Sequence, residues 1–424
     1  DGGEGQLAMA KGFRGRKLYY AAFELLVRMA KERIGSSIGE AALYELSLLT
    51  QESAFDHEEL NRLLIGNEFP RLHPDIDSFV SYYQAMDLLQ LGFSDWAKVP
   101  LGRIRKGSYW DFLMQYWTAV GEVARGRIDR AIALFQGLTE EPGLPQPLFE
   151  KAALQYSRLV FEKGDFQTAF VIYNNLKIKG VREFGRIQLE RAWVYYYLKD
   201  FGKAMGILTA LQAPYFKPSL TFERHILEMI IYRDLCHYEA VEYVAQRFRE
   251  NFKDSLIAIR NRQALRDDRV LFNLSVMNRE VQEDANLIDQ IRREGNLLKD
   301  YPWEGFSFYN PLLEGYARID EILQARVGNQ LEEKARAAAN ELLDAEEQVQ
   351  FLEYTSRLDR LRIRRGTELK YLSQEISLVT FEKIFWPVDS EFWWDEIPDY
   401  NMNISSRCGD SGLSEENDLE KDFE

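Results

Sequence analysis

Apolar residues recur at three- and four-residue spacings almost without a break from Leu7 to Lys383. This is the period of helices that bury one face. Residues 18–34 and 112–126 show it most clearly, and no run of strand length alternates cleanly between apolar and polar positions. The pattern predicts an all-α protein.

Four stretches within this pattern share one phrase: residues 124–138, 162–176, 197–211 and 234–248. Each has a turn residue, then an aromatic residue or Ile, then a small residue, then a bulky one. The small positions are 38, 35 and 37 residues apart, and Ala97 lies 34 residues before the first of them. We expect helix pairs that cross closely at these positions: Ala131, Ala169, Ala204 and Val241.

The phrase resembles the tetratricopeptide repeat, a helix–turn–helix unit of about 34 residues. The matching residues are Gly126, Ile128, Ala131 and Phe135, then Gly164, Phe166, Ala169 and Tyr173, then Lys199, Phe201, Ala204 and Leu208. The resemblance implies a right-handed α-solenoid of stacked helix pairs over residues 75–252, preceded by an N-terminal helical cap over 1–74. A single unit cannot bury its own apolar face, so the units stack.

Beyond the repeats, residues 253–383 are highly charged and carry an apolar stripe. From Ile319 to Ile376 the apolar residues recur at roughly heptad spacing, which predicts long helices in a coiled-coil-like arm. Seventy residues of unbroken helix would reach about 105 Å. A turn near Gly328 or within 344–348 would fold the arm back, and another pair of unusually long solenoid helices is the alternative.

The C-terminus has two unlike parts. Residues 384–408 combine acids with aromatics, and we expect an aromatic segment that either clasps the helices or docks a partner through Trp386, Trp393 and Trp394. Residues 409–424 are polar and acidic and are predicted to be a disordered tail.

Composition narrows the function. The 424 residues carry 53 Lys and Arg against 68 Asp and Glu, a net charge of −15. Nucleic-acid binding and broad docking to anionic lipid both need a basic face, so the balance argues against them. The charge is uneven, because seven acids and only Lys421 follow Cys408. No apolar run approaches the ~18 residues of a transmembrane helix.

Two cysteines exclude a disulfide scaffold and a cysteine-built zinc site, and one Cys236–Cys408 disulfide remains open. The polar, glycine-rich start at Asp1 suits the mature end left by signal-peptide cleavage as well as a trimmed chain. We therefore expect a periplasmic or otherwise exported protein, with the cytoplasm as the alternative.

Catalytic and cofactor motifs are not found in the sequence. The four histidines have no zinc spacing, and no phosphate-binding loop occurs. Cys236 and His237 are adjacent on a helical pattern and point about 100° apart, which disfavours a nucleophile–base pair. Residues 408–412 match a serine-protease segment without its scaffold or histidine. The basic cluster of Lys11, Arg14, Arg16 and Lys17 reads as a helix-flanking loop. We expect no catalytic residue, metal or cofactor.

The function that we expect is a non-catalytic scaffold that binds partner proteins, as in an envelope assembly, secretion or motility complex. The inner face of the first helices would form a groove for a peptide or helix, and the arm would add coiled-coil contacts. A glycan-acting enzyme using Glu391, Asp395 and Glu396 beside the tryptophans, and a cytoplasmic peptide-binding regulator, are the alternatives. The predicted groove residues are Tyr116, Lys151, Arg158, Phe161, Arg186, Trp193 and Tyr196.

Overall fold

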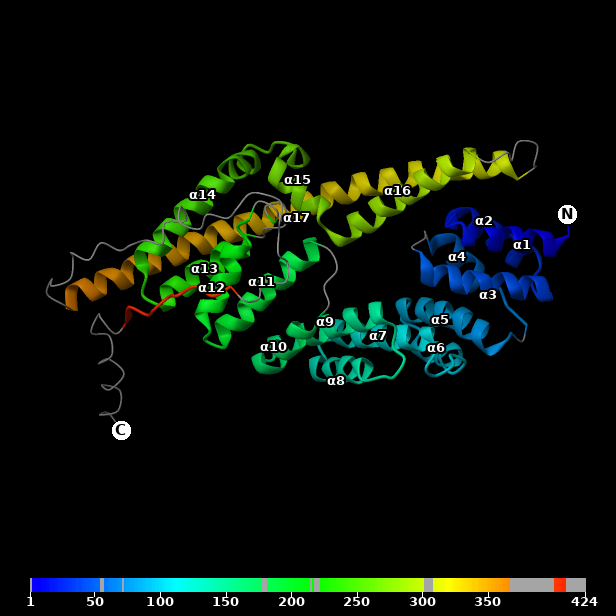
Figure 1. Ribbon diagram of the computed structural model, residues 1–424, viewed down its shortest axis with the longest axis horizontal. Helices are drawn as coiled ribbons and strands as arrows, with labels where there is room; N and C mark the ends of the chain where they lie inside the picture. Colours follow the sequence, from blue (N-terminus) through cyan, green and yellow to red (C-terminus); the bar gives the residue numbers. More distant parts are fainter. Residues whose placement is uncertain are drawn as a thin grey trace. The chain divides into compact units, whose positions relative to one another are not determined.

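The computed structural model describes residues 2–53, 57–70, 72–176, 181–213, 216, 222–300, 308–366 and 400–408. Every regular element among them is a helix (Figure 1), which confirms the all-α prediction. Helices that follow one another in the sequence pack as antiparallel pairs, and the last of them, α17 (Tyr309–Gly366), is 58 residues long. The arrangement is compatible with a helical repeat.

The chain divides into two compact units, each of which is described by itself. Unit 1 comprises residues 1–163 and 279–330, and unit 2 comprises residues 164–278 and 331–424. Unit 1 contains α1 (Gly3–Gly15), α2 (Tyr19–Glu32), α3 (Ser37–Glu52), α4 (His57–Ile65), α5 (Pro74–Gln90), α6 (Ser94–Leu101), α7 (Tyr109–Ala124), α8 (Ile128–Thr139), α9 (Gln146–Glu162), α16 (Arg279–Lys299) and the start of α17. Unit 2 contains α10 (Phe166–Asn175), α11 (Val181–Tyr197), α12 (Phe201–Ala210), α13 (Glu223–Asp234), α14 (Tyr238–Arg260), a short 3-10 helix (Leu265–Asp267), α15 (Arg269–Val276) and the rest of α17.

One turn recurs between consecutive helices. Its central residue has a left-handed backbone, with φ between 60° and 84° at Gly92, Gly126, Gly164, Lys199 and Cys236. The next amide closes the turn on the end of the first helix. In unit 2, for example, the amide of His237 donates to the carbonyl of Tyr232 at 2.8 Å. This is the Schellman ending, which normally uses glycine because a Cβ strains the left-handed conformation.

The small residues predicted at the helix crossings are all buried. Ala97, Ala131, Ala169, Ala204 and Val241 have no exposed surface. The same holds for the small positions of the first helices, where Ser157 replaces alanine and satisfies its hydroxyl by donating to the carbonyl of Leu154 at 2.8 Å. The repeat phrase therefore marks real packing positions.

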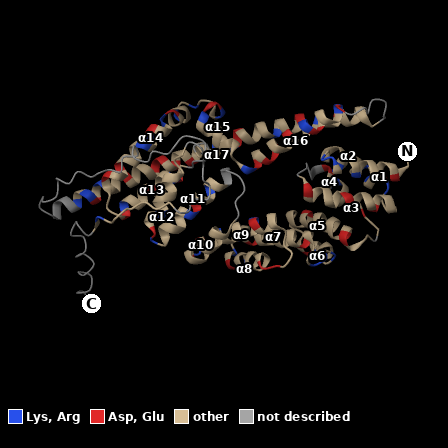
Figure 2. Ribbon diagram, viewed as in Figure 1, with Lys and Arg blue, Asp and Glu red and all other residues tan. Residues whose placement is uncertain are grey.

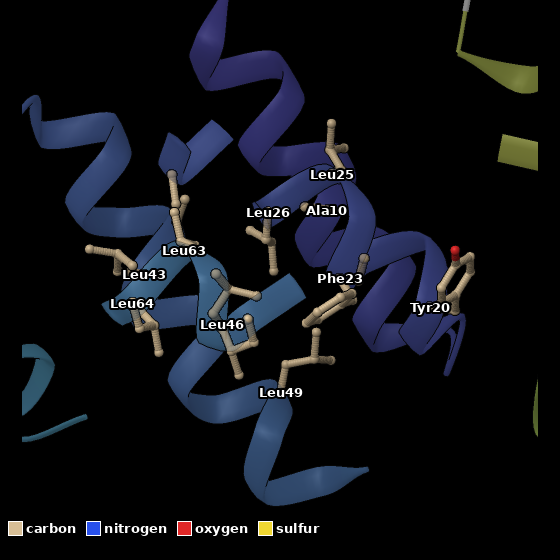
Figure 3. Close-up of a cluster of buried hydrophobic side chains, with 14 of the residues drawn as sticks. Ala10, Tyr20, Phe23, Leu25, Leu26, Leu43, Leu46, Leu49, Leu63 and Leu64 are labelled. Carbon is tan, nitrogen blue, oxygen red and sulfur yellow. The ribbon is translucent and has the colours of Figure 1, made fainter. Parts of the chain in front are cut away.

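The first core of unit 1 is centred on α1 to α4 and also takes buried residues from α5, α7, α16 and the start of α17. Leu26, Leu46 and Leu64 point into it from three different helices (Figure 3). Glu294 of α16 joins this region to α17, because its carboxylate accepts from the Tyr316 hydroxyl and from the Tyr20 amide, both at 2.8 Å. A second core forms where α7, α8 and α9 meet around Phe135.

Residues of α17 pack on a hydrophobic core in each unit. Ile319 and Val327 pack on the core of unit 1, and Leu342, Val349 and Leu352 are buried against α13 and α14 in unit 2. The helix continues without a turn through Gly328 and through 344–348, where the sequence left a reversal open. Much of the predicted heptad stripe is therefore occupied by the protein's own helices.

Candidate interaction site

The predicted groove residues of unit 1 have unlike surroundings. Tyr116 is only 8% exposed and packs edge-to-face on Phe135, with ring centres 5.7 Å apart, so it belongs to the core. Burial raises the pKa of its hydroxyl. On α9, Lys151 is exposed, while Arg158 and Phe161 are half-buried. These three residues leave a mixed apolar and basic surface on that helix.

The groove residues of unit 2 are engaged by their own helix and its neighbours. Arg186 pairs with Glu190 one turn away at 3.3 Å, and the half-buried Trp193 packs edge-to-face on Tyr196. The Tyr196 hydroxyl donates to Asp234 at 2.7 Å. Four of the seven predicted residues thus lie in unit 1 and three in unit 2, so a single continuous groove stays a prediction.

The predicted C-terminal docking residues, Trp386, Trp393 and Trp394, lie outside the described residues, as do the carboxylates of the glycan alternative, Glu391, Asp395 and Glu396, and the tail at 409–424. Residues 400–408, the end of the predicted segment, are described. They run without regular structure along α12 and α13, in red in Figure 1. Met402 donates its amide to the carbonyl of Gly202 at 3.0 Å, and Arg407 donates to Leu235 at 3.0 Å.

Residues 400–402 can approach α12 closely because two residues on that face of the helix are glycines. Gly202 and Gly206 lie about one turn apart on one face of the helix. A Cβ at Gly206 would stand 2.1 Å from the carbonyl oxygen of Tyr400, and one at Gly202 would stand 2.9 Å from that of Met402. In the sequence, the four-residue spacing of these two glycines is the one signal that could have indicated close packing of another segment on α12.

A disulfide between Cys236 and Cys408 fixes the end of the segment, so neither thiol is available as a nucleophile. Beside it, Nε2 of His237 donates to the carbonyl of Ser405 at 2.7 Å, and desolvation lowers the pKa of this imidazole. Cys236 and His237 therefore hold residues 400–408 in place and do not form a nucleophile–base pair. The basic cluster is likewise used internally, since Lys11 and Arg14 pair with Glu45 at 3.4 and 3.2 Å.

A cavity of about 950 Å³ in unit 1 lies between α2, α4 and the start of α17. Its walls carry acids and bases in equal number, four of each. Burial raises the pKa of Glu24 there, with Glu59 adding to the effect. Because the charges of the lining balance, the cavity favours neither anionic nor cationic ligands. Residues 54–56, which precede α4, are not described.

The clearest unpartnered surface is an apolar patch on the α5–α6 hairpin of unit 1. We define the α5–α6 patch as Leu91, Phe93, Trp96 and Val99, which are 54 to 74% exposed. Ala97 turns inward and is fully buried, so the short helix α6 presents Trp96 and Val99 to solvent. A solitary exposed apolar side chain is ordinary, but four close together form a candidate interaction site.

A hollow of about 760 Å³ adjoins the α5–α6 patch, and its lining is acidic. Trp96 and Val99 form part of its wall, and the charged residues lining it are all acids: Glu68, Asp87 and Asp95. Two bases lie close by: Lys98 pairs with Asp95 at 2.8 Å, and Arg103 donates to Gln84 in the wall of the hollow at 2.9 Å. The repeat spacing singled out only the buried Ala97 in this segment and gave no sign of the exposed Trp96 beside it.

Other chemistry is limited in the described part of the chain. No group of three or more His, Cys, Asp or Glu is placed to hold a metal ion there. Over the same residues, no helix combines the length and apolarity that a membrane span requires. In comparisons with known proteins, no family model, no curated protein and no solved structure matches the chain.

Proposed function

We propose that this protein is a non-catalytic scaffold of tetratricopeptide-like helix pairs that holds partner proteins. The observation that carries the proposal is the α5–α6 patch, where Trp96 is 74% and Val99 70% exposed on a well-packed helix pair. Tryptophans of this kind dominate the affinity of protein interfaces. The predicted groove residues that remain exposed or half-buried, such as Lys151 and Trp193, are a further candidate surface.

The partner that fits the α5–α6 patch is a basic amphipathic segment. Its apolar side chains would cover Trp96 and Val99, and its Lys or Arg side chains would face Glu68, Asp87 and Asp95. Complementary charge adds specificity and speeds association, and it makes binding depend on salt. An acidic segment would meet three like charges in the same place.

Two designed amphipathic peptides test this assignment. They share their apolar positions and carry either Lys or Glu at the flanking positions, and binding is measured by titration calorimetry. The Lys peptide is expected to bind and to weaken with added salt. Replacing both Trp96→Ser and Val99→Ser should weaken its binding about tenfold or more.

The matched control is Val171→Ser, which removes a 50% exposed apolar side chain from α10 in unit 2. It should leave binding unchanged. Equal binding of the two peptides, or full binding by the double variant, would refute the α5–α6 patch as the docking surface.

The disulfide supports an exported location, since such bonds persist in oxidising compartments such as the periplasm. Thiol labelling in intact cells of the native host tests it. We expect no labelling of Cys236 or Cys408 until a reductant is added. Labelling of both without reductant would favour the cytoplasmic alternative.

A further inference from the structure

The part of α17 in unit 2 has two faces of opposite kind. Its inner face packs on α13 and α14 through residues such as Leu342, Ala345 and Val349, all under 4% exposed. Its outer face carries large apolar side chains that are exposed: Phe351 at 63% and Tyr354 at 62%. Helices of soluble units normally present polar residues on this side.

We define the outer stripe of α17 as Leu343, Phe351, Tyr354, Leu358 and Leu361. At 3.6 residues per turn these positions fall within about 80° of the helix circumference. All are exposed apart from Leu358, which is half-buried. The stripe is therefore one continuous apolar strip and not a scatter of single residues, which makes it a candidate interface.

Charges flank the outer stripe in a mirrored order. Asp344 and Glu347 are exposed at its N-terminal end. Arg362 stands at its C-terminal end, where its side chain is 78% exposed and lies 3.7 Å from Asp359. Figure 2 shows the basic residues gathering toward the C-terminal end of α17. Acids precede the apolar strip and bases follow it.

The spacing makes the outer stripe complementary to itself. A point between Tyr354 and Thr355 lies equally far from Glu347 and Arg362. Phe351 and Leu358 are also equidistant from it. A second α17 laid antiparallel across this point places Glu347 of each copy against Arg362 of the other. A parallel helix would place acid against acid.

We infer that the outer stripe of α17 binds the outer stripe of a second copy of this chain, antiparallel, in a two-fold symmetric dimer. Such an interface uses the same surface on both subunits, so one set of residues supplies both sides. The contact from Glu347 to Arg362 is about 23 Å long at 1.5 Å per residue. It buries two aromatic rings from each copy and forms two intermolecular ion pairs.

Charge reversal tests both the partner and the register. Sedimentation equilibrium should show a dimer for the wild-type full-length protein, and Glu347→Arg or Arg362→Glu alone should weaken it about tenfold. Each single variant places like charges together twice. A mixture of the two single variants should dimerise at least as well as wild type, because every reversed residue then faces an opposite charge.

Two controls complete the experiment. Lys253→Glu changes an exposed residue of α14 away from the outer stripe and should leave the dimer intact. Tyr354→Asp places a charge at the centre and should give a monomer with unchanged helical circular dichroism. A monomeric wild-type protein, or a dimer that neither single reversal weakens, overturns the inference. A mixture no stronger than the single variants overturns the register.

Discussion

The two units bury charge in different ways. In the described part of unit 1 the buried acidic and basic side chains are the carboxylates of Glu45, Glu122 and Glu294, and each has its partner near the surface or a neutral donor. Glu122 is 3% exposed, and Arg125 and Arg127 reach it from positions about half exposed, at 2.9 Å each. Glu294 takes its bonds from the Tyr316 hydroxyl and a backbone amide. Water can reach the arginine partners of Glu122, whereas Glu294 is held by neutral donors.

Unit 2 instead encloses a whole charged network. Arg224, His225 and Glu228 of α13 are each 3% exposed or less. Glu228 pairs with Arg247 of α14 and lies 3.7 Å from Arg224, which donates to Nε2 of His225 at 2.9 Å. Burial lowers the pKa of Arg224 to about 10, against the opposing effect of Glu228.

This difference predicts how strongly each unit is destabilised when one buried charge is removed. A buried ion network adds little net stability compared with well-packed apolar residues, but removing one member leaves the others charged and unsolvated. Unit 2 should therefore respond sharply to single charge changes, while unit 1 should tolerate them. Hydrogen exchange with mass spectrometry reports opening free energies segment by segment and so measures the units separately in one sample.

The largest effect is expected from Glu228→Gln. The amide keeps the shape but leaves Arg224 and Arg247 without their counter-charge, which should cost the α13–α14 region about 3–5 kcal/mol. The matched change in unit 1, Glu294→Gln, retains an acceptor for Tyr316 and should cost about 1 kcal/mol. Exchange in peptides covering α13 and α2 is the measurement. Equal losses in both units would remove the contrast between them.

The disulfide gives the next largest effect. Replacing Cys236→Ser and Cys408→Ser frees a loop of 172 residues, and such bonds commonly contribute about 2–4 kcal/mol. We expect faster exchange around α12 and α13, where residues 400–408 are held, and unchanged exchange in α1 to α4. Reduction of the wild-type protein should reproduce the pattern. A matching loss in α1 to α4 would show that the units do not open independently.

The sequence predicted the parts of the fold that depend on neighbours in the chain. Ala131 and Ala204 could be recognised because paired helices are joined by short turns, so a small residue at a fixed distance from the turn reports the crossing directly. The left-handed turns at Gly126 and Gly164 were recognisable for the same reason. These contacts are local in sequence, so the repeat fixes the number of residues between the turn and the helix crossing.

The contacts that the sequence did not show join distant segments or depend on helix rotation. Leu342 packs on α13 across about a hundred residues, and its heptad spacing fits a free coiled coil equally well. Two cysteines permitted a disulfide, but only the path of 400–408 brings them together. Trp96 was missed because the eight residues of α6 are too few for a period to show which aromatic side chain faces outward.

Acidification should produce the smallest effect and the only one with opposite signs in the two units. Burial, Arg224 and Arg247 lower the pKa of His225 in the folded state. As pH falls below the unfolded value of about 6.5, the unfolded chain takes up this proton first, so unit 2 loses up to about 1.4 kcal/mol per pH unit. Burial raises the pKa of Glu223 in the same unit and offsets part of this loss.

In unit 1, burial raises the pKa of both Glu24 and Glu294. The folded state therefore takes up these protons first, and unit 1 should gain stability as pH falls toward the raised values. Hydrogen exchange at pH 7 and pH 5.5, corrected for the intrinsic rate, should show α13 less protected and α2 equally or better protected. His225→Gln keeps an acceptor for Arg224 without the proton, and it should abolish most of the change in α13. If α13 keeps its pH dependence in that variant, the buried histidine is not its cause.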